Sequence, residues 1–176
     1  MIAVISDSHV PRRADGIPQR FIEVLEESEQ AVHCGDFAEE QVKEKLEQSC
    51  DLVAVKGNCD FFDLPNSETF EKNGLKFGVY HGTGITPRGH RPTLVKICDD
   101  LEVDILLHGH THKQEAVKED GKILLNPGSC TGVSGGTARA SAPQMMKIHL
   151  EEDELIVDLI KLQEGEMISE RKSFDT

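Results

Sequence analysis

The sequence has little of what marks secreted or membrane-spanning chains. The N-terminal methionine is followed by neither a basic region nor a long apolar run. Secretory signals need both features, and a membrane-spanning helix needs about 20 consecutive apolar residues. We therefore expect a cytoplasmic protein that has no membrane partner.

Cysteine is sparse and poorly arranged for pairing. The chain has 5 cysteines, an odd number, and no two of them stand as Cys-x-x-Cys. Small secreted domains use even sets of closely spaced cysteines, whereas cytoplasmic thiols stay reduced. We expect no structural disulfide. The cysteines are Cys34, Cys50, Cys59, Cys98 and Cys130.

Basic residues are also in deficit. The 19 Lys and Arg residues face 32 Asp and Glu residues, so the formal net charge is −13. Extended nucleic acid is an unfavourable partner because no basic footprint offsets the repulsion from its phosphates. The deficit does not argue against a small phosphate ester, since bound cations would supply the local positive charge.

The length of 176 residues suits a single domain with its own core, spanning residues 1–176. No repeat, linker or second core is visible. Strands and helices are expected to alternate at first, and antiparallel hairpins to follow. We expect strands at 2–6, 31–34, 51–56 and 104–107, helices at 19–27, 39–48 and 93–101, and hairpins at 68–80, 116–125 and 144–162.

Two segments are harder to assign. Residues 130–143 are rich in Gly, Ser, Thr and Ala, and are expected to form a mobile surface loop. The last dozen residues are polar and are compatible with either an edge strand or a loose tail. Neither segment interrupts the α/β pattern that precedes it.

The motif His108-Gly109-His110-Thr111-His112 follows the apolar run of residues 105–107 directly. That run is expected to be a buried strand, and ligands bind beyond the carboxyl ends of strands in open α/β sheets. Side chains alternate along an extended segment, so His110 and His112 can point the same way. Neutral imidazole is the commonest side-chain ligand of transition metals.

Five strands each run into a potential metal ligand. The set contains four imidazoles, two carboxylates and one amide, which suits Mn, Fe, Zn, Co or Ni. It is too large for one ion that keeps an open position, but it is the right size for two ions that share a carboxylate. The residues are Asp7, His9, Asp36, Asn58, His81, His110 and His112.

Taken in order, these motifs resemble the calcineurin-like metallophosphoesterases. The resemblance covers residues 2–129, and Asn126-Pro127-Gly128-Ser129 is similar to the small bacterial and archaeal phosphodiesterase subgroup. It implies a two-sheet sandwich flanked by helices (αββα). It also implies hydrolysis of small phosphate diesters by a metal-bound hydroxide at a two-metal centre. The motifs are Asp7-x-His9, Gly35-Asp36, Gly57-Asn58, His81-Gly82 and Gly109-His110-x-His112.

The resemblance also implies roles for individual residues. Asp7, His9 and His112 would hold one ion, whereas Asn58, His81 and His110 would hold the other, and Asp36 would bridge the two. Asp36, Asn58 and His110 would act in catalysis through the metal-bound hydroxide. We expect two divalent ions, with Mn²⁺ first and Ni²⁺, Co²⁺, Fe²⁺, Zn²⁺ or Mg²⁺ as alternatives.

One residue departs from the family pattern. Related phosphatases carry His after the Asn, whereas this chain has Cys59 followed by Asp60. A thiol is a weaker proton donor than imidazolium, so esters with good leaving groups would suffer least. Asp60 and His108 are expected to support the ligands.

Two arginines follow His81 in a loop. Arg88 and Arg91 would contact a substrate phosphate if that loop overhangs the site, because guanidinium suits bidentate phosphate contact. A solvated loop accounts for them equally well.

Two other functions stay open at this point. One is a phosphomonoesterase or protein phosphatase, which the short chain and the missing His at position 59 disfavour. The other is a non-catalytic scaffold like a eukaryotic retromer subunit of similar fold. A scaffold does not need a full ligand set, and here no ligand position is replaced. Homo-oligomerisation is also left open.

Overall fold

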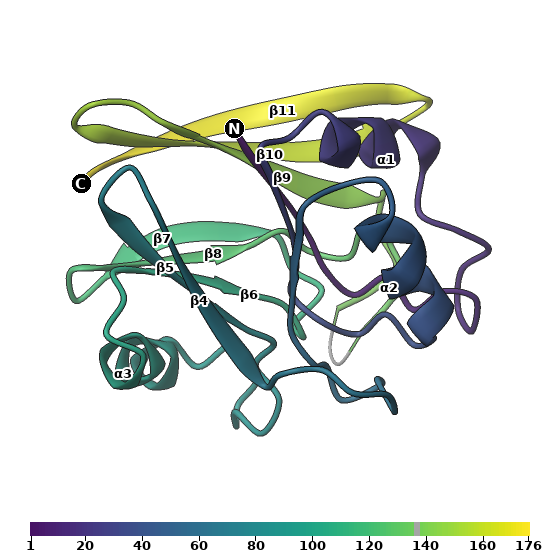
Figure 1. The fold of residues 1–176 in the computed structure, drawn as a ribbon, viewed down its shortest axis with the longest axis horizontal. Helices are drawn as coiled ribbons and strands as arrows, with labels where there is room; N and C mark the ends of the chain where they lie inside the picture. Colours follow the sequence, from purple (N-terminus) through teal and green to yellow (C-terminus); the bar gives the residue numbers. More distant parts are fainter. Residues whose placement is uncertain (136–137) are drawn as a thin grey trace.

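The computed structural model describes residues 1–135 and 138–176. Two β-sheets pack face to face, and helices cover the outer face of each (Figure 1). The expected αββα sandwich is therefore confirmed. Among the described residues, no helix is long and apolar enough to cross a membrane.

The first sheet has six strands in the order β11-β10-β9-β1-β2-β3. Strands β1, β2 and β3 are parallel, and β3 forms one edge of the sheet. Strand β9 pairs antiparallel with β1, β10 antiparallel with β9, and β11 antiparallel with β10. Helices α1 (Gln19–Glu26) and α2 (Glu40–Glu47) connect the parallel strands. The strands are β1 (Ile2–Ile5), β2 (Gln30–His33), β3 (Leu52–Ala54), β9 (Gln144–Leu150), β10 (Glu154–Gln163) and β11 (Glu166–Asp175).

The second sheet has five strands in the order β4-β5-β6-β8-β7. Helix α3 (Arg91–Asp100) connects β5 to β6, which are parallel neighbours. The outer strands close as hairpins at Asn73-Gly74 and Asp120-Gly121. The strands are β4 (Ser67–Lys72), β5 (Leu75–Tyr80), β6 (Ile105–His108), β7 (Glu115–Glu119) and β8 (Lys122–Asn126).

The alternation of side chains along the strands divides the core into layers. Val4 and Val32 of one sheet meet Val79 and Leu107 of the other in the space between them. On the outer face of the six-stranded sheet, Phe21 and other apolar side chains of α1 pack onto β1 and β2. A smaller apolar cluster packs α3 against the five-stranded sheet. Because both faces of the central strands are covered, β1 and β6 are buried along their whole length.

The expected elements lie close to the observed ones, and the open alternatives are settled. The polar C-terminal segment is an edge strand, since β11 pairs with β10 over ten residues. The predicted loop at 130–143 begins with the fully buried Cys130. Its residues 136–137 lie outside the described part of the chain, so the expected mobility is not tested. Helix α3 begins two residues before the expected start, with Pro92 in its first turn.

Candidate metal centre

The ends of β1, β2, β5 and β6 bring buried carboxylates and imidazoles together at one edge of the sandwich. Three groups of ligand atoms form there, two of which share no residue, and within each group all atoms lie within 4.8 Å of one another. One of these two contains Asp7, His9 and His112, and the other contains Asp36, His81 and His110. Residues separated by about a hundred positions in the sequence thus meet at this edge.

Asp36 connects the two groups. Its Oδ2 lies 3.5 Å from His9 Nε2 and 3.4 Å from His81 Nε2. Its Oδ1 accepts a hydrogen bond of 2.7 Å from the backbone N–H of Cys59. This leaves Oδ2 facing both imidazoles, which is the position that a bridging carboxylate needs.

Asp7 is held at the base of the centre. It is fully buried, and its Oδ1 lies 3.2 Å from His112 Nε2. Both carboxylate oxygens also accept from the backbone N–H of His110, at 3.2 and 3.1 Å. The end of β1 is therefore tied to the histidine loop after β6.

Backbone carbonyls orient two of the imidazoles. His81 Nδ1 lies 2.7 Å from the carbonyl oxygen of Cys34, and His112 Nδ1 lies 2.8 Å from that of Val133. A carbonyl only accepts, so each Nδ1 carries the proton and each Nε2 is turned toward the carboxylates. His81 Nε2 and His110 Nδ1 are buried and make no hydrogen bond with any residue that the structure describes. Unpaired imidazole nitrogens beside two carboxylates fit a divalent cation.

Burial and charge set the protonation of these groups in the metal-free protein. Burial opposes the ionised form of Asp7, but the hydrogen bond with His112 and the charge of His81 outweigh it, so the pKa lies below its usual value. The pKa of Asp36 is lowered in the same way by His81. Burial opposes the charge on His81, yet Asp36 and Asp7 raise its pKa to about 9. Burial, then the charge of His81, lowers the pKa of His110 to about 4.

Asn58 and Cys59 lie at the solvent side of the centre. Asn58 is exposed, and its Nδ2 donates to Cys59 Sγ at 3.3 Å. Cys59 Sγ lies within 4.8 Å of ligand atoms of His9 and Asp36. Burial and the charge of Asp36 raise the pKa of the thiol to about 11, so it is uncharged at neutral pH.

The buried Asp60 organises the loop that carries Asp36. Its Oδ2 accepts from the backbone N–H groups of Asp36 and Gly57 at 2.9 and 2.8 Å. Its Oδ1 accepts from Ala38 N–H at 2.9 Å. A Cβ at Gly57 would meet the backbone nitrogen and Oδ1 of Asp36, so this close approach requires glycine. Asp60 acts on the centre by holding Asp36 in place.

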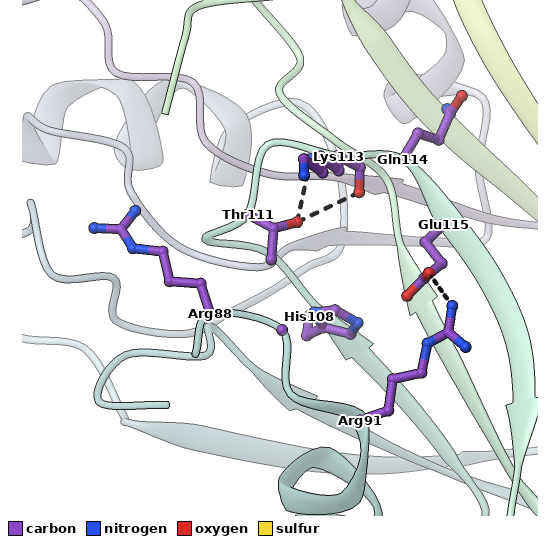
Figure 2. Close-up of a pocket in the computed structure, with 8 residues that line it drawn as sticks. Arg88, Arg91, His108, Thr111, Lys113, Gln114 and Glu115 are labelled. Carbon is purple, nitrogen blue, oxygen red and sulfur yellow. Dashed lines mark hydrogen bonds and ion pairs between the residues drawn. The ribbon is translucent and has the colours of Figure 1, made fainter. Parts of the chain in front are cut away.

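The two strand-end histidines that precede the ligands support the loops instead. His33 Nδ1 accepts from Gly35 N–H at 3.1 Å, and burial lowers the pKa of His33 to about 3. His108 Nδ1 lies 3.1 Å from the side-chain nitrogen of Asn126. Burial lowers the pKa of His108 to about 4, so both rings are neutral. His108 Nε2 has no hydrogen-bond partner, and the residue lines a cavity of about 260 Å³ (Figure 2).

The two arginines of the loop differ in their surroundings. Arg91 forms ion pairs with Glu115 at 2.6 Å and Glu119 at 3.5 Å, away from the ligand cluster. Figure 2 shows it extended toward Glu115, whereas Arg88 points in the opposite direction. Arg88 donates to the carbonyl oxygen of His110 at 3.4 Å. The structure thus brings only Arg88 to the ligand loop.

Three polar residues at and after the end of β8 also hold the centre, although their sequence pattern pointed to no such role. Asn126 Nδ2 donates to the carbonyl oxygen of Gly109 at 2.9 Å. Ser129 Oγ donates to the carbonyl oxygen of Asp7 at 2.8 Å, and Thr131 Oγ1 to that of Ser8 at 2.9 Å. The sequence marked Asn126 and Ser129 only as part of a motif of the family resemblance, and it did not indicate these contacts.

Comparison with known proteins agrees with this geometry. The profile of the calcineurin-like phosphoesterase superfamily domain matches residues 1–153. A probable metallophosphoesterase of Methanocaldococcus jannaschii is 36% identical over 93% of this chain and 82% of its own length. One from Methanothermobacter thermautotrophicus is 31% identical over 92% of each.

A solved structure extends the comparison to the whole fold. Vacuolar protein sorting 29 of Entamoeba histolytica, crystallised in complex with Zn²⁺, superposes with a TM-score of 0.88 at 32% identity, over 99% of both chains. The fold of this chain is therefore shared from end to end with a metal-binding relative. On the family profile and the archaeal relatives together, the chain belongs to the calcineurin-like phosphoesterase superfamily.

Proposed function

We propose that this protein hydrolyses small phosphate diesters at a centre of two divalent metal ions. The observation that carries the proposal is the position of Asp36 Oδ2 between His9 Nε2 and His81 Nε2, at 3.5 and 3.4 Å. Asp7, His9 and His112 would hold one ion, and Asn58, His81 and His110 the other, with Asp36 shared between them. Family membership supports metal-dependent cleavage of phosphoesters.

The donor set suits the cations expected from the sequence. Divalent ions held there would polarise a phosphoryl oxygen and lower the pKa of water. The protein's own part is to hold the ligands. The carbonyl oxygens of Cys34 and Val133 fix the two imidazoles that face Asp36 and Asp7. Nitrogen and oxygen donors without a thiolate fit Mn²⁺ together with the other ions named above, and we propose Mn²⁺ as the first of them to test.

The proposed preference for esters with good leaving groups rests on Cys59. Its thiol is uncharged and stands at the position where related phosphatases place a histidine, so the centre lacks a strong proton donor for the departing oxygen. General-acid help is typically worth about 10²–10⁴-fold. Aryl oxides leave readily without a proton, whereas alkyl oxides do not. Activated aryl diesters should therefore be cleaved much faster than alkyl monoesters.

The experiment is a hydrolysis screen on chelator-stripped protein. Each of Mn²⁺, Ni²⁺, Co²⁺, Fe²⁺, Zn²⁺ and Mg²⁺ is added back, and bis(4-nitrophenyl) phosphate is compared with the monoester of the same leaving group, 4-nitrophenyl phosphate, and with alkyl monoesters. We expect no turnover without metal and strong preference for the diester with Mn²⁺. Faster cleavage of monoesters would refute the proposed specificity.

Substitutions at position 59 sharpen the screen. Cys59→His should raise monoester turnover, because imidazolium is a better proton donor than the thiol. Cys59→Ala should change little, and it serves as the matched control. If Cys59→Ala reduces turnover as much as loss of a metal ligand, the thiol has a direct role, and the proposal of a centre without a dedicated proton donor is wrong.

A binding scaffold is the second candidate function. The similarity to vacuolar protein sorting 29, which was crystallised with Zn²⁺, favours it. The name of that relative refers to protein sorting rather than to hydrolysis, and the likeness covers 99% of both chains. The same screen separates the two. A scaffold would bind the metal, as measured by elemental analysis, and would hydrolyse no ester with any ion.

A further inference from the structure

A second hollow lies beside the metal centre, between the loop after β3 and the end of β5. Its volume is about 640 Å³, within the range of small-molecule sites. Its wall includes Asn58, a proposed ligand, and Asp60, which holds Asp36. On the other side it is lined by Tyr80 and Thr83, which flank the ligand His81. The hollow therefore adjoins the proposed metal centre.

Phe61 is the unusual residue in this hollow. Its side chain is 79% exposed, although a phenyl ring in water forgoes the burial that stabilises most aromatic side chains. The guanidinium carbon of Arg12 lies 5.6 Å from the ring centroid. Arg12 is itself paired with Glu39 at 2.9 Å, which holds that side chain beside the ring. The ring is thus positioned at the edge of the hollow and left open to a ligand.

The rest of the wall combines the ring of Tyr80 with polar side chains. Lys56, Asn66 and Thr83 line the hollow around Phe61. The other large exposed apolar side chains of the described residues, Met167 and Ile168, lie on β11, at the edge of the six-stranded sheet opposite β3. Protein interfaces bury an apolar centre of several side chains. One freely exposed ring, in a hollow that also holds the Tyr80 ring and polar side chains, instead suits a small planar ligand.

We propose that this hollow, the Phe61 pocket, binds a planar aromatic group of the phosphate ester, which stacks on Phe61. The identification of the ligand as an ester rests on the proposed function, since the phosphoryl group would occupy the adjacent centre. The polar wall would accept or donate hydrogen bonds at ring heteroatoms, so both aryl and nucleobase groups fit. An offset-stacked aromatic pair binds more tightly than an apolar pair that buries the same area. The difference is about 0.5–1.5 kcal/mol, a factor of about 2–10 in affinity.

Calorimetric titration of the Mn²⁺-loaded protein tests this without turnover. The probes are phenylphosphonate and cyclohexylphosphonate, which have the same phosphonate and similar apolar size but only one of which has a π face. The wild type should bind phenylphosphonate about 2–10-fold more tightly than cyclohexylphosphonate. Phe61→Ala should remove that preference, and Phe61→Leu should remove it while restoring part of the affinity for both probes.

Ile168→Ala is the matched control, because it removes another exposed apolar side chain far along the chain. It should leave both affinities unchanged. The proposed pocket would be overturned if wild type and Phe61→Ala preferred phenylphosphonate over cyclohexylphosphonate equally. It would also be overturned if the wild type did not bind phenylphosphonate.

The outcomes also separate this inference from the proposed function. If the protein hydrolyses diesters and the probe preference does not depend on Phe61, the pocket assignment fails alone. If no ester is hydrolysed with any metal but the preference depends on Phe61, the pocket assignment stands and the catalytic proposal fails.

Discussion

The metal centre and the hairpin turns use the same left-handed backbone conformation for opposite purposes. At the turns, residues with φ near 50° are exposed and are followed by glycine at φ near 80°, as in the Asn73-Gly74 pair. Primed two-residue turns favour this combination in hairpins. At the centre, five ligands have positive φ, and all of them are buried. They are Asp7, His9, Asp36, His110 and His112.

The difference lies in what holds the conformation. A left-handed residue other than glycine is disfavoured by about 1–2 kcal/mol. A hairpin turn needs no further support, whereas the centre is held by a network of buried hydrogen bonds. Asp60 accepts three backbone N–H groups, and Ser129 fixes the carbonyl of Asp7. Strain at the centre therefore lies in the ligand loops and is sustained by residues that are not themselves ligands.

The largest effect should come from Asp36→Asn. The amide keeps the shape of the side chain but not the charge that would bind both ions. Turnover should fall by about 10³-fold or more, because the charge stabilisation by the metals is worth several kcal/mol. Kinetics and elemental analysis measure the loss, with Asp63→Asn, an exposed residue of a nearby loop, as control. Normal metal content and rate in Asp36→Asn would contradict the bridging role.

Asp60→Ala tests whether the supporting network matters as much as the ligands. Three buried N–H groups lose their acceptor, so the metal-free protein should lose about 3 kcal/mol or more of unfolding free energy. The metal concentration needed for activity should rise about 10–100-fold, as for other residues that orient ligands. Urea denaturation and metal titration measure these changes, and Asp63→Ala is the control. An unchanged metal requirement would mean that the Asp36 loop holds its conformation without Asp60.

The pH dependence of metal binding should follow His81. Its pKa is raised to about 9 in the metal-free protein, so at neutral pH a metal ion must displace its proton. Affinity for Mn²⁺ should therefore rise by up to about tenfold per pH unit between about pH 7 and about pH 9, then level off.

The stability of the metal-free protein should change with pH in the opposite direction, so that it decreases as the pH rises. The folded state binds the His81 proton more tightly than the unfolded state does. The contribution of this proton to the free energy of unfolding is therefore complete below about pH 6.5. It is lost as the pH rises through about 9. Thermal unfolding at several pH values measures the loss, and calorimetry in buffers of different ionisation enthalpy counts the released protons. Metal binding without proton release would refute the assignment.

The smallest effect should come from the hairpin end. Gly74 has φ of 79°, and a Cβ there would meet no atom within 4 Å. Gly74→Ala should therefore reduce stability by only about 1 kcal/mol, through the backbone alone. Turnover and metal affinity should not change. A loss of activity at full metal occupancy would show that the hairpin turn and the metal centre are coupled.

The sequence by itself identified the proposed ligand residues and the sheet edge where they gather. Apolar runs predicted the strands, and each proposed ligand directly follows such a run, so its place at a strand end depended only on local pattern. The αββα architecture was implied by the order of the motifs and is confirmed. The edge strand β11 was left open, because its ten residues are largely polar and their pairing with β10 is a property of the sheet.

The tertiary structure alone decided how the ligands are held. Three contacts depend on distances between residues far apart in the chain. Asp36 faces His9 and His81, Val133 orients His112, and Asp60 anchors the Asp36 loop. The separation of Arg88 from Arg91 was equally invisible, since either could have faced the site. Such contacts follow from strand order and sheet packing, which no local pattern encodes. The exposure of Phe61 has the same origin, because only the folded loop shows which aromatic side chain the core leaves out.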